Sequence, residues 1–244
     1  MIIAISNHKG GVSKTTTTVN LGAALAIQNK KVLLCDLDPQ ANLTQSLGVS
    51  EFKVSIYDAL RGNAKLELIQ VKENLYVIPA CVDLAAVDLE LASEPGREFI
   101  LKELLSKIAD EFDFVLLDCP PSMGLLTINA LVAADEYLIP LQAHFLALKG
   151  VGKLIEVEKK ITSRLNPNLK LCGVLLTQFD NRKILNRDVK ETISEHFGAK
   201  LFKTQIRNNI ALAEAPIHGQ DIFTYSPESN GASDYLDLSK ELIL

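Results

Sequence analysis

Eight consecutive residues near the amino terminus have the types and spacing needed to bind a polyphosphate chain. Residues Lys9–Thr16 read Lys-Gly-Gly-Val-Ser-Lys-Thr-Thr. They follow a short apolar run, Ile2–Ile5, and precede an amphipathic segment, Thr17–Gln28. This order predicts a strand, a glycine-containing loop and a helix. Such an arrangement points backbone N–H groups and a helix N-terminus at phosphate oxygens.

Two side chains of the loop have the chemistry of a nucleoside triphosphate site. We expect Lys14 to neutralise the β- and γ-phosphates and the Thr15 hydroxyl to bind Mg²⁺. The common pattern G-x-x-x-x-G-K-[ST] is not met, because His8 and Ser13 stand where it requires glycine. The predicted nucleotide contacts in the loop are Lys9, Gly10, Gly11, Val12, Ser13, Lys14, Thr15 and Thr16.

A second lysine, Lys9, stands at the head of the loop, where its side chain can leave its own site. One interpretation is an ordinary solvated loop lysine. The other is a contact with the phosphates of a second subunit that faces this one, since a triphosphate with one magnesium ion keeps a net negative charge. The second interpretation predicts nucleotide held between two subunits.

Three acidic residues lie at or just beyond the ends of apolar runs. An ionised carboxylate is costly in such a place without a partner, so we expect Asp118 to face magnesium through a water, or the Thr15 hydroxyl. Asp36 and Asp38 are placed to orient a water and a hydrated magnesium ion. The alternatives are a buried structural carboxylate for Asp118, and a turn acid that caps a helix beginning near Ala41 for the other two.

Apolar runs alternate with helical patterns along the chain, which has 244 residues, 48% of them hydrophobic. Runs that are apolar throughout are typical of a parallel sheet covered on both faces. The elements therefore predict an α/β fold with a doubly wound, mainly parallel sheet, and a ligand at the carboxyl ends of its strands. The predicted strands are Ile2–Ser6, Val32–Asp36, Leu75–Pro79, Phe114–Asp118, Tyr137–Leu141, Leu171–Thr177 and Leu201–Thr204. The predicted helices are Thr15–Gln28, Arg97–Glu111, Met123–Ala133, Leu146–Leu165, Ile184–Phe197, Asn208–Ala215 and Ala232–Ile243.

Four motifs together resemble those of one ATPase family. The loop resembles the deviant Walker A motif, K-G-G-x-x-K-[ST], of the ParA/MinD group of P-loop ATPases. Val32–Asn42 resembles the second motif of the group, and Phe114–Ser122 resembles its Walker B segment. Leu212–Pro216 is similar to a late segment of the small partition ATPases called ParA or Soj. The resemblance implies one ParA-like domain of the P-loop NTPase type over residues 1–244.

The resemblance implies an ATP hydrolase that uses ATP and Mg²⁺ as a switch, with Lys14 and Asp118 also in the catalytic site. ATP would join two copies into a homodimer, in which Lys9 crosses to the nucleotide of the partner. Asp38 would support hydrolysis, with Gln40 as a second group that orients water. The dimer would bind double-stranded DNA without sequence preference. A ParB-type centromere-binding protein would stimulate a slow hydrolysis, and the cargo would be a plasmid or a chromosome.

The chain departs from the family pattern at three places. The family has Pro-Arg-Asn before the late segment, and its asparagine contacts the base, which here implies Asn209. Arg207 replaces the proline and either stacks on the adenine or points to solvent. His144 stands where relatives carry an acid near the nucleotide across the dimer, and Lys149 where close relatives often carry Glu. These two changes either alter the affinity of the dimer or have no effect.

The formal net charge of −5 argues against a protein covered in positive potential. DNA binding would then depend on a local patch that is doubled in the dimer, and it would weaken with salt. The alternative is a solvated helix face, because Glu191 and Glu195 lie among the basic residues. The candidate DNA contacts are Arg182, Lys183, Arg187, Lys200 and Lys203.

The C-terminal segment Tyr235–Leu244 is short and acidic, which argues against the membrane-binding helix of MinD-like proteins. No apolar run reaches the length of a membrane span, and the chain begins without a signal peptide pattern, so we expect a cytoplasmic protein that associates with the nucleoid when ATP is bound. Rival hypotheses are a positioning ATPase for a protein organelle or receptor cluster, a filament former, and a metal-cluster carrier. The sequence argues against a metal-cluster carrier, because none of its four cysteines forms a C-x-x-C pair.

Overall fold

All the strands of the computed structural model belong to one sheet; the model describes residues 1–143 and 147–243, without the side chains of 147–154 and 158. The strand order is β3-β4-β2-β5-β1-β6-β7-β8. Neighbouring strands run parallel except β3, which is antiparallel to β4. The strands are β1 Ile2–Ile5, β2 Val32–Asp36, β3 Ile69–Lys72, β4 Leu75–Ile78, β5 Phe114–Asp118, β6 Glu136–Gln142, β7 Lys170–Phe179 and β8 Leu201–Arg207.

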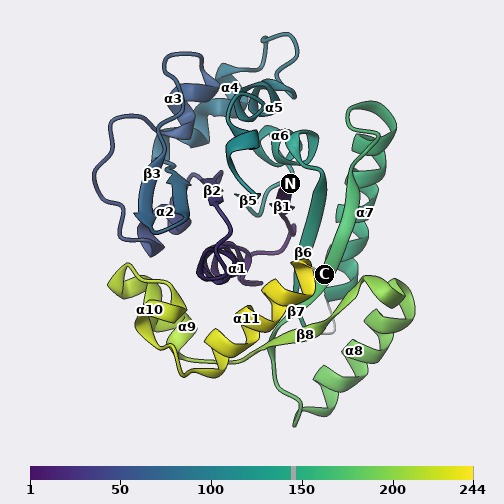
Figure 1. Ribbon diagram of the computed structural model, residues 1–244. Coiled ribbons are helices and arrows are strands. Elements are labelled where there is room, and N and C mark those ends of the chain that lie inside the picture. Colours follow the sequence, from purple (N-terminus) through teal and green to yellow (C-terminus); the bar gives the residue numbers. More distant parts are fainter. Residues whose placement is uncertain (144–146, 244) are drawn as a thin grey trace.

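Helices connect the strands and lie on both sides of the sheet (Figure 1). None of the described helices is long and apolar enough to cross a membrane. The α-helices are α1 Lys14–Ile27, α2 Asn42–Ser46, α3 Ile56–Leu60, α4 Val87–Glu90, α5 Ile100–Leu105, α6 Leu125–Ala133, α7 Ala147–Arg164, α8 Ile184–Phe197, α9 Ala211–Glu214, α10 Ile222–Tyr225 and α11 Asn230–Ile243. Short 3-10 segments directly follow helices, η3 (Gly198–Lys200) after α8 and η4 (Ala215–His218) after α9, whereas η2 (Ala109–Glu111) stands apart from α5.

Successive residues of the central strands enter two different cores. Ile3 and Ile5 of β1 pack with residues of α1, α10 and α11, whereas Ala4 packs with residues of α3, α5, α6 and α8. Leu33 and Leu34 of β2 divide between the two cores in the same way. Both faces of the sheet are therefore covered, which explains why its strands are apolar throughout rather than alternating.

The doubly wound, mainly parallel sheet predicted from the sequence is confirmed. The bounds of α8 match the prediction, and the other long helices begin or end within two residues of it. The prediction missed β3, whose four residues are partly exposed at the antiparallel edge. The helix predicted over Arg97–Glu111 was too long, because helical structure is interrupted between α5 and η2.

The strand order brings three carboxyl ends together at one edge of the sheet. Ile5 at the end of β1 lies beside Asp118 at the end of β5, and Asp118 lies beside Asp36 at the end of β2. Within the sheet, β2 lies toward one edge from β1. The later strands β6, β7 and β8 lie toward the other edge. The loops that leave this point in opposite directions open a crevice, the usual place for a ligand in such sheets.

Candidate functional site

The loop between β1 and α1 has a strained, open backbone. Gly11 and Ser13 both have left-handed conformations, with φ of 74° and 68°. For Ser13 this costs on the order of 1 kcal/mol, and such strain is concentrated at functional sites. A Cβ atom added to Gly10 or Gly11 would meet no atom within 4 Å, so the glycines leave a free space along the loop. That space suits a phosphate group approached by backbone N–H groups.

Lys14 lies inside this loop and is only 7% exposed. Its ammonium donates a hydrogen bond to the carbonyl of Lys9 at 3.2 Å. Burial lowers the pKa of Lys14, and the negative charge of Asp118 is the largest opposing influence. A buried cation of this kind lacks a full set of partners, and a polyphosphate would supply them.

Beneath the loop, Asp118 is fully buried and accepts two hydroxyl hydrogen bonds. Thr15 Oγ1 donates to one carboxylate oxygen at 2.7 Å, and Thr18 Oγ1 to the other at 3.3 Å. Burial, followed by the charge of Asp36, raises the pKa of Asp118 to about 8. Two adjacent buried carboxylates favour a nearby cation, and hydroxyl and carboxylate oxygens are the ligands that Mg²⁺ prefers. The residues therefore fit a magnesium ion carried by a bound nucleotide.

Asp36 and Asp38 differ in what their carboxylates do. Asp36 is fully buried and accepts hydrogen bonds from the Asp38 N–H at 3.1 Å and from Thr44, through N–H at 2.9 Å and hydroxyl at 2.7 Å. Burial raises its pKa to about 6, against the effect of the Thr44 hydrogen bonds. Asp36 thus holds α2 in place, whereas Asp38 accepts one bond, from the Gln40 N–H, and lines the cavity.

A cavity of about 490 Å³ lies over the phosphate loop. Two residues of the predicted loop set do not line it. Val12 is 1% exposed and offers only its backbone, and Lys9 stands outside the cavity wall. No hydrogen bond or ion pair joins the Lys9 ammonium to another residue in the described part of the chain. The lining includes Gly10, Gly11, Ser13, Lys14, Thr15, Thr16, Asn20, Asp38, Gln40, Gln178, Pro216 and Gln220.

Gln178 is a site residue that the sequence interpretation missed. It lies near the end of β7 with a left-handed φ of 51°. Its amide nitrogen donates to the Gly11 carbonyl at 3.1 Å and to Ser13 Oγ at 3.2 Å. Its amide oxygen accepts a hydrogen bond from Gln142. The available signal was a polar residue directly after the apolar run Leu171–Thr177, much as Asp38 follows the run that ends at Asp36.

A second cavity of about 240 Å³ continues from the first and shares Ser13, Thr16 and Gln178 with it. It is also lined by Arg207, Asn208, Asn209, Leu212 and Tyr235. Asn209 Oδ1 accepts the Ala211 N–H at 2.9 Å, which leaves the amide NH₂ group for a ligand. The Arg207 guanidinium is bound to Asp234 at 2.6 Å, and the Arg207 side chain is 48% exposed.

The five candidate DNA contacts are all exposed. Arg182 and Lys203 line a polar cleft of about 560 Å³ together with Arg207. Arg182 forms an ion pair with Asp180 at 3.0 Å, and hydrogen bonds from Arg182 lower the pKa of Asp180 to about 2. Lys183 and Arg187 lie at the start of α8, and Lys200 follows its other end. His144 and the side chain of Lys149 lie outside the described residues.

Comparisons with known proteins agree with this geometry. Residues 1–171 match the AAA domain family. The sporulation initiation inhibitor protein Soj of Bacillus subtilis is 46% identical, over 99% of this chain and 97% of Soj. The chromosome-partitioning ATPase Soj of Treponema pallidum is 42% identical, over 97% of this chain and 94% of the Treponema protein. The chain belongs to the ParA/Soj family of partition ATPases.

Solved structures show the same fold as this ParA/Soj family member. Cobyrinic acid a,c-diamide synthase from Mycobacterium smegmatis, with bound ADP and magnesium, is 36% identical with a TM-score of 0.87, covering 99% of this chain and 93% of that one. The cell division ATPase MinD from Pyrococcus furiosus is 31% identical with a TM-score of 0.83, covering 99% and 98%. The predicted P-loop NTPase fold is confirmed. Because these neighbours carry different names, the fold alone does not define the cargo.

Proposed function

We propose that this chain is an ATP-dependent switch for DNA partition. Two copies enclose ATP and Mg²⁺ between them, and the resulting homodimer binds double-stranded DNA without sequence preference. A ParB-type partner stimulates hydrolysis, which returns monomers and releases the DNA, so that a plasmid or chromosome is segregated. The observation that supports this most strongly is the continuous crevice from the buried Lys14 to Asn209, with Asp38 in its wall.

Each residue of the crevice has a definite task in this proposal. Lys14 and the backbone N–H groups of the loop bind the β- and γ-phosphates. Thr15 and Asp118 would hold Mg²⁺, which when bound would supply positive charge next to the transferred phosphoryl group. Asp38 orients the attacking water. Among the described residues that line the cavity, Asp38 is the one carboxylate and there is no histidine, so we expect hydrolysis to be slow until a partner stimulates it.

The dimer depends on Lys9. Its backbone carbonyl is held by Lys14, while its side chain stands outside the wall of its own cavity. An amine at that place is free to reach across to the phosphates of a facing copy. The two triphosphates would then be neutralised by amines from both subunits, which links ATP binding to dimer formation.

The test of this proposal is Lys9→Ala, compared with Lys65→Ala, which removes an exposed lysine far from the loop in the chain. We expect Lys9→Ala to bind ATP but to stay monomeric by multi-angle light scattering with ATP and Mg²⁺, because the cross-subunit charge contact is lost. Lys65→Ala should dimerise normally. A Lys9→Ala protein that dimerises as well as the unchanged protein would contradict the proposal.

DNA binding is tested by neutralising the polar cleft. The double variant Arg182→Gln with Lys203→Gln should weaken retention of a non-specific duplex by the ATP-bound protein. It should also reduce the slope of log affinity against log salt by about 1 to 2 per subunit, because each lost phosphate contact removes about one released counterion. An unchanged slope would place the DNA contacts elsewhere, and Lys183, Arg187 and Lys200 would be changed next.

A further inference from the structure

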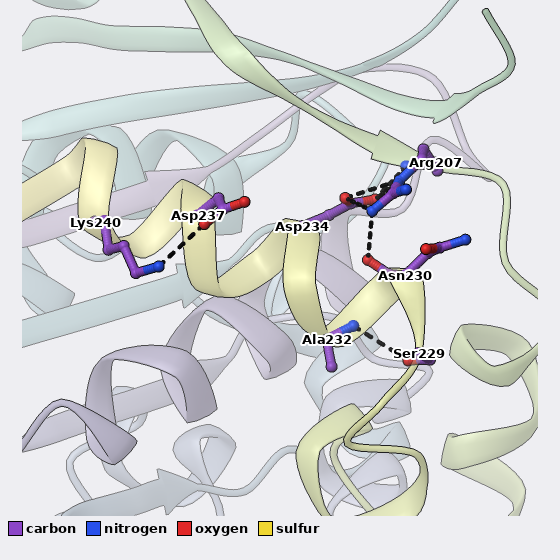
Figure 2. Close-up of polar contacts among 7 residues, drawn as sticks. All are labelled: Arg207, Ser229, Asn230, Ala232, Asp234, Asp237 and Lys240. Carbon is purple, nitrogen blue, oxygen red and sulfur yellow. Dashed lines mark hydrogen bonds and ion pairs between the residues drawn. The ribbon is translucent and has the colours of Figure 1, made fainter.

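Arg207 is bound to one carboxylate through both its main chain and its side chain. Its N–H donates to Asp234 Oδ2 at 2.8 Å, its Nη2 to Oδ1 at 2.6 Å and its Nε to Oδ1 at 2.9 Å (Figure 2). The Asp234 side chain is 8% exposed, against 48% for Arg207. Charge-assisted bonds with this forked geometry are among the stronger ones in proteins. The end of β8 is therefore tied firmly to α11.

A second carboxylate ties α11 to the same strand. Glu241 accepts the N–H of Lys203 at 2.7 Å and that of Thr204 at 3.0 Å. Asp234 and Glu241 are seven residues apart, which is about 10.5 Å along a helix. The β8 N–H groups that they bind, at Arg207 and at Lys203 and Thr204, are separated by a similar distance, roughly 11 Å along a strand. β8 is at the edge of the sheet, and the two acids give its outward N–H groups partners that an edge strand otherwise lacks.

The Asp234 and Glu241 contacts differ in their position relative to the nucleotide crevice. The cavity next to the phosphate loop is lined by Arg207, Asn209 and Tyr235, but by neither Lys203 nor Glu241. Tyr235, the residue after Asp234, is fully buried, and its hydroxyl lies 3.2 Å from Thr17 Oγ1 on α1. The Asp234 end of α11 thus joins the wall of the cavity to α1, whereas the Glu241 end contacts the far end of α1, where Gln28 donates to Ser239.

We propose that Asp234 is a positioning residue for the base of the nucleotide. It holds Arg207, and with it the cavity wall from Arg207 to Asn209, where the base of ATP would contact the protein. It acts through Arg207 and does not touch the reacting atoms. The proposal rests on the proposed function in taking ATP as the ligand and in placing its base at the Asn209 end of the crevice. It assigns a role to the C-terminal helix in base recognition, separate from phosphate binding.

The test compares Asp234→Asn with its matched control, Glu241→Gln. In each variant, an α11 carboxylate that accepts hydrogen bonds from β8 N–H groups is replaced by a neutral amide of the same shape. Dissociation constants are measured by calorimetry with Mg²⁺ for ATP and for inorganic tripolyphosphate, which has no base. We expect Asp234→Asn to weaken ATP binding about tenfold, as the loss of a charged hydrogen bond implies, and to leave tripolyphosphate within about twofold. Glu241→Gln should leave both within about twofold.

Two results would overturn the proposal: an unchanged ratio of ATP to tripolyphosphate affinity in Asp234→Asn, or an equal loss in Glu241→Gln. If the unchanged protein bound tripolyphosphate as tightly as ATP, the base would add nothing to affinity and this proposal would also fall, whereas failure to bind either ligand would count against the proposed function. If Asp234→Asn does not fold, Arg207→Met with Asp234→Leu replaces the ion pair with an apolar one. This double variant should fold yet still lose base-dependent affinity, because the N–H at position 207 has no acceptor. Normal ATP affinity in it would show that the pair is only structural.

Discussion

The two ends of the crevice are built in different ways. The phosphate end is built mainly from one continuous segment, Lys9–Thr16, at the junction of β1 and α1, with residues such as Asp38 and Gln220 added from elsewhere. The base end draws Ser13, Gln178, Asn209 and Tyr235 from four separate parts of the chain. The phosphate end therefore depends mainly on local backbone geometry. The base end depends on how β7, β8 and α11 pack, so changes far from the loop in sequence can alter it.

The electrostatics of the two ends differ as well. At the phosphate end, Lys14 and Asp118 are charged or titrating groups removed from water, where each interaction is strong. At the base end, the Arg207–Asp234 pair has one half-exposed member, where solvent weakens the interaction. We therefore expect larger effects from changes at the phosphate end.

The largest effect is expected for Lys14→Ala. It removes the buried cation that faces the phosphates and leaves Asp118 without its nearest opposite charge, so binding of both ATP and tripolyphosphate should fall by more than about 100-fold. Calorimetry on both ligands measures this. Lys65→Ala serves as the control. Retained tripolyphosphate binding in Lys14→Ala would erase the distinction between the two ends.

Asp38→Ala should separate hydrolysis from binding. Its carboxylate lines the cavity and accepts one backbone N–H bond, so its loss should reduce the ATP turnover rate by about 100-fold, the usual scale for a group that orients or activates water. ATP affinity should change by no more than a few-fold, and the ATP-bound dimer should persist by light scattering. Asp38→Asn is the companion variant. Rapid turnover by Asp38→Ala would remove the role assigned to this residue.

Gln178 joins the two ends, and two substitutions separate its side chain from its backbone. Gln178→Ala and Gln178→Gly both lose the bonds to Gly11 and Ser13, so each should weaken tripolyphosphate binding about tenfold. Glycine also relieves the left-handed φ of 51°, so Gln178→Gly should melt about 2 °C above Gln178→Ala. Equal melting temperatures would mean that the backbone at this position is not strained.

The smallest effect is expected for Tyr235→Phe. It removes one hydroxyl that bonds to the buried Thr17, so the melting temperature should fall by about 2 to 4 °C. ATP affinity should stay within about twofold, since Arg207 remains bound to Asp234. A loss of ATP affinity larger than that of Asp234→Asn would make Tyr235, rather than the ion pair, the main link between α11 and the base cavity.

Much of the fold could be predicted because its strands are buried on both faces. Runs such as Phe114–Asp118 contain enough consecutive apolar residues to be recognised locally. β3, α3 and α10 lack such an unbroken apolar run and, with four or five residues each, are too short to show a periodicity. The Arg97–Glu111 segment is helical in pattern, but its ends are decided by contacts with α6 that a sequence does not show, such as the bond from the Leu101 N–H to Asn129.

In the candidate site, the contiguous loop and the acids at strand ends were visible in the sequence. The different roles of Asp36 and Asp38 could not be predicted from the sequence, because they depend on the hydrogen bonds that Thr44 of α2 donates to Asp36. The positions assigned to nucleotide, metal and DNA remain predictions for each residue. Gln178 was missed because a glutamine after a strand has no distinctive spacing, and its contacts come from a loop 165 residues away in sequence.

By itself, the sequence determined the phosphate loop and the parallel sheet, because both follow from local order: glycines and lysines in a short segment, and apolar residues in unbroken runs. Only the tertiary structure decided the base end, where one carboxylate on the last helix meets an arginine 27 residues before it. The physical reason is that a hydrogen bond forms at about 3 Å between particular atoms, and packing of the whole chain, not residue type, brings those atoms to that distance.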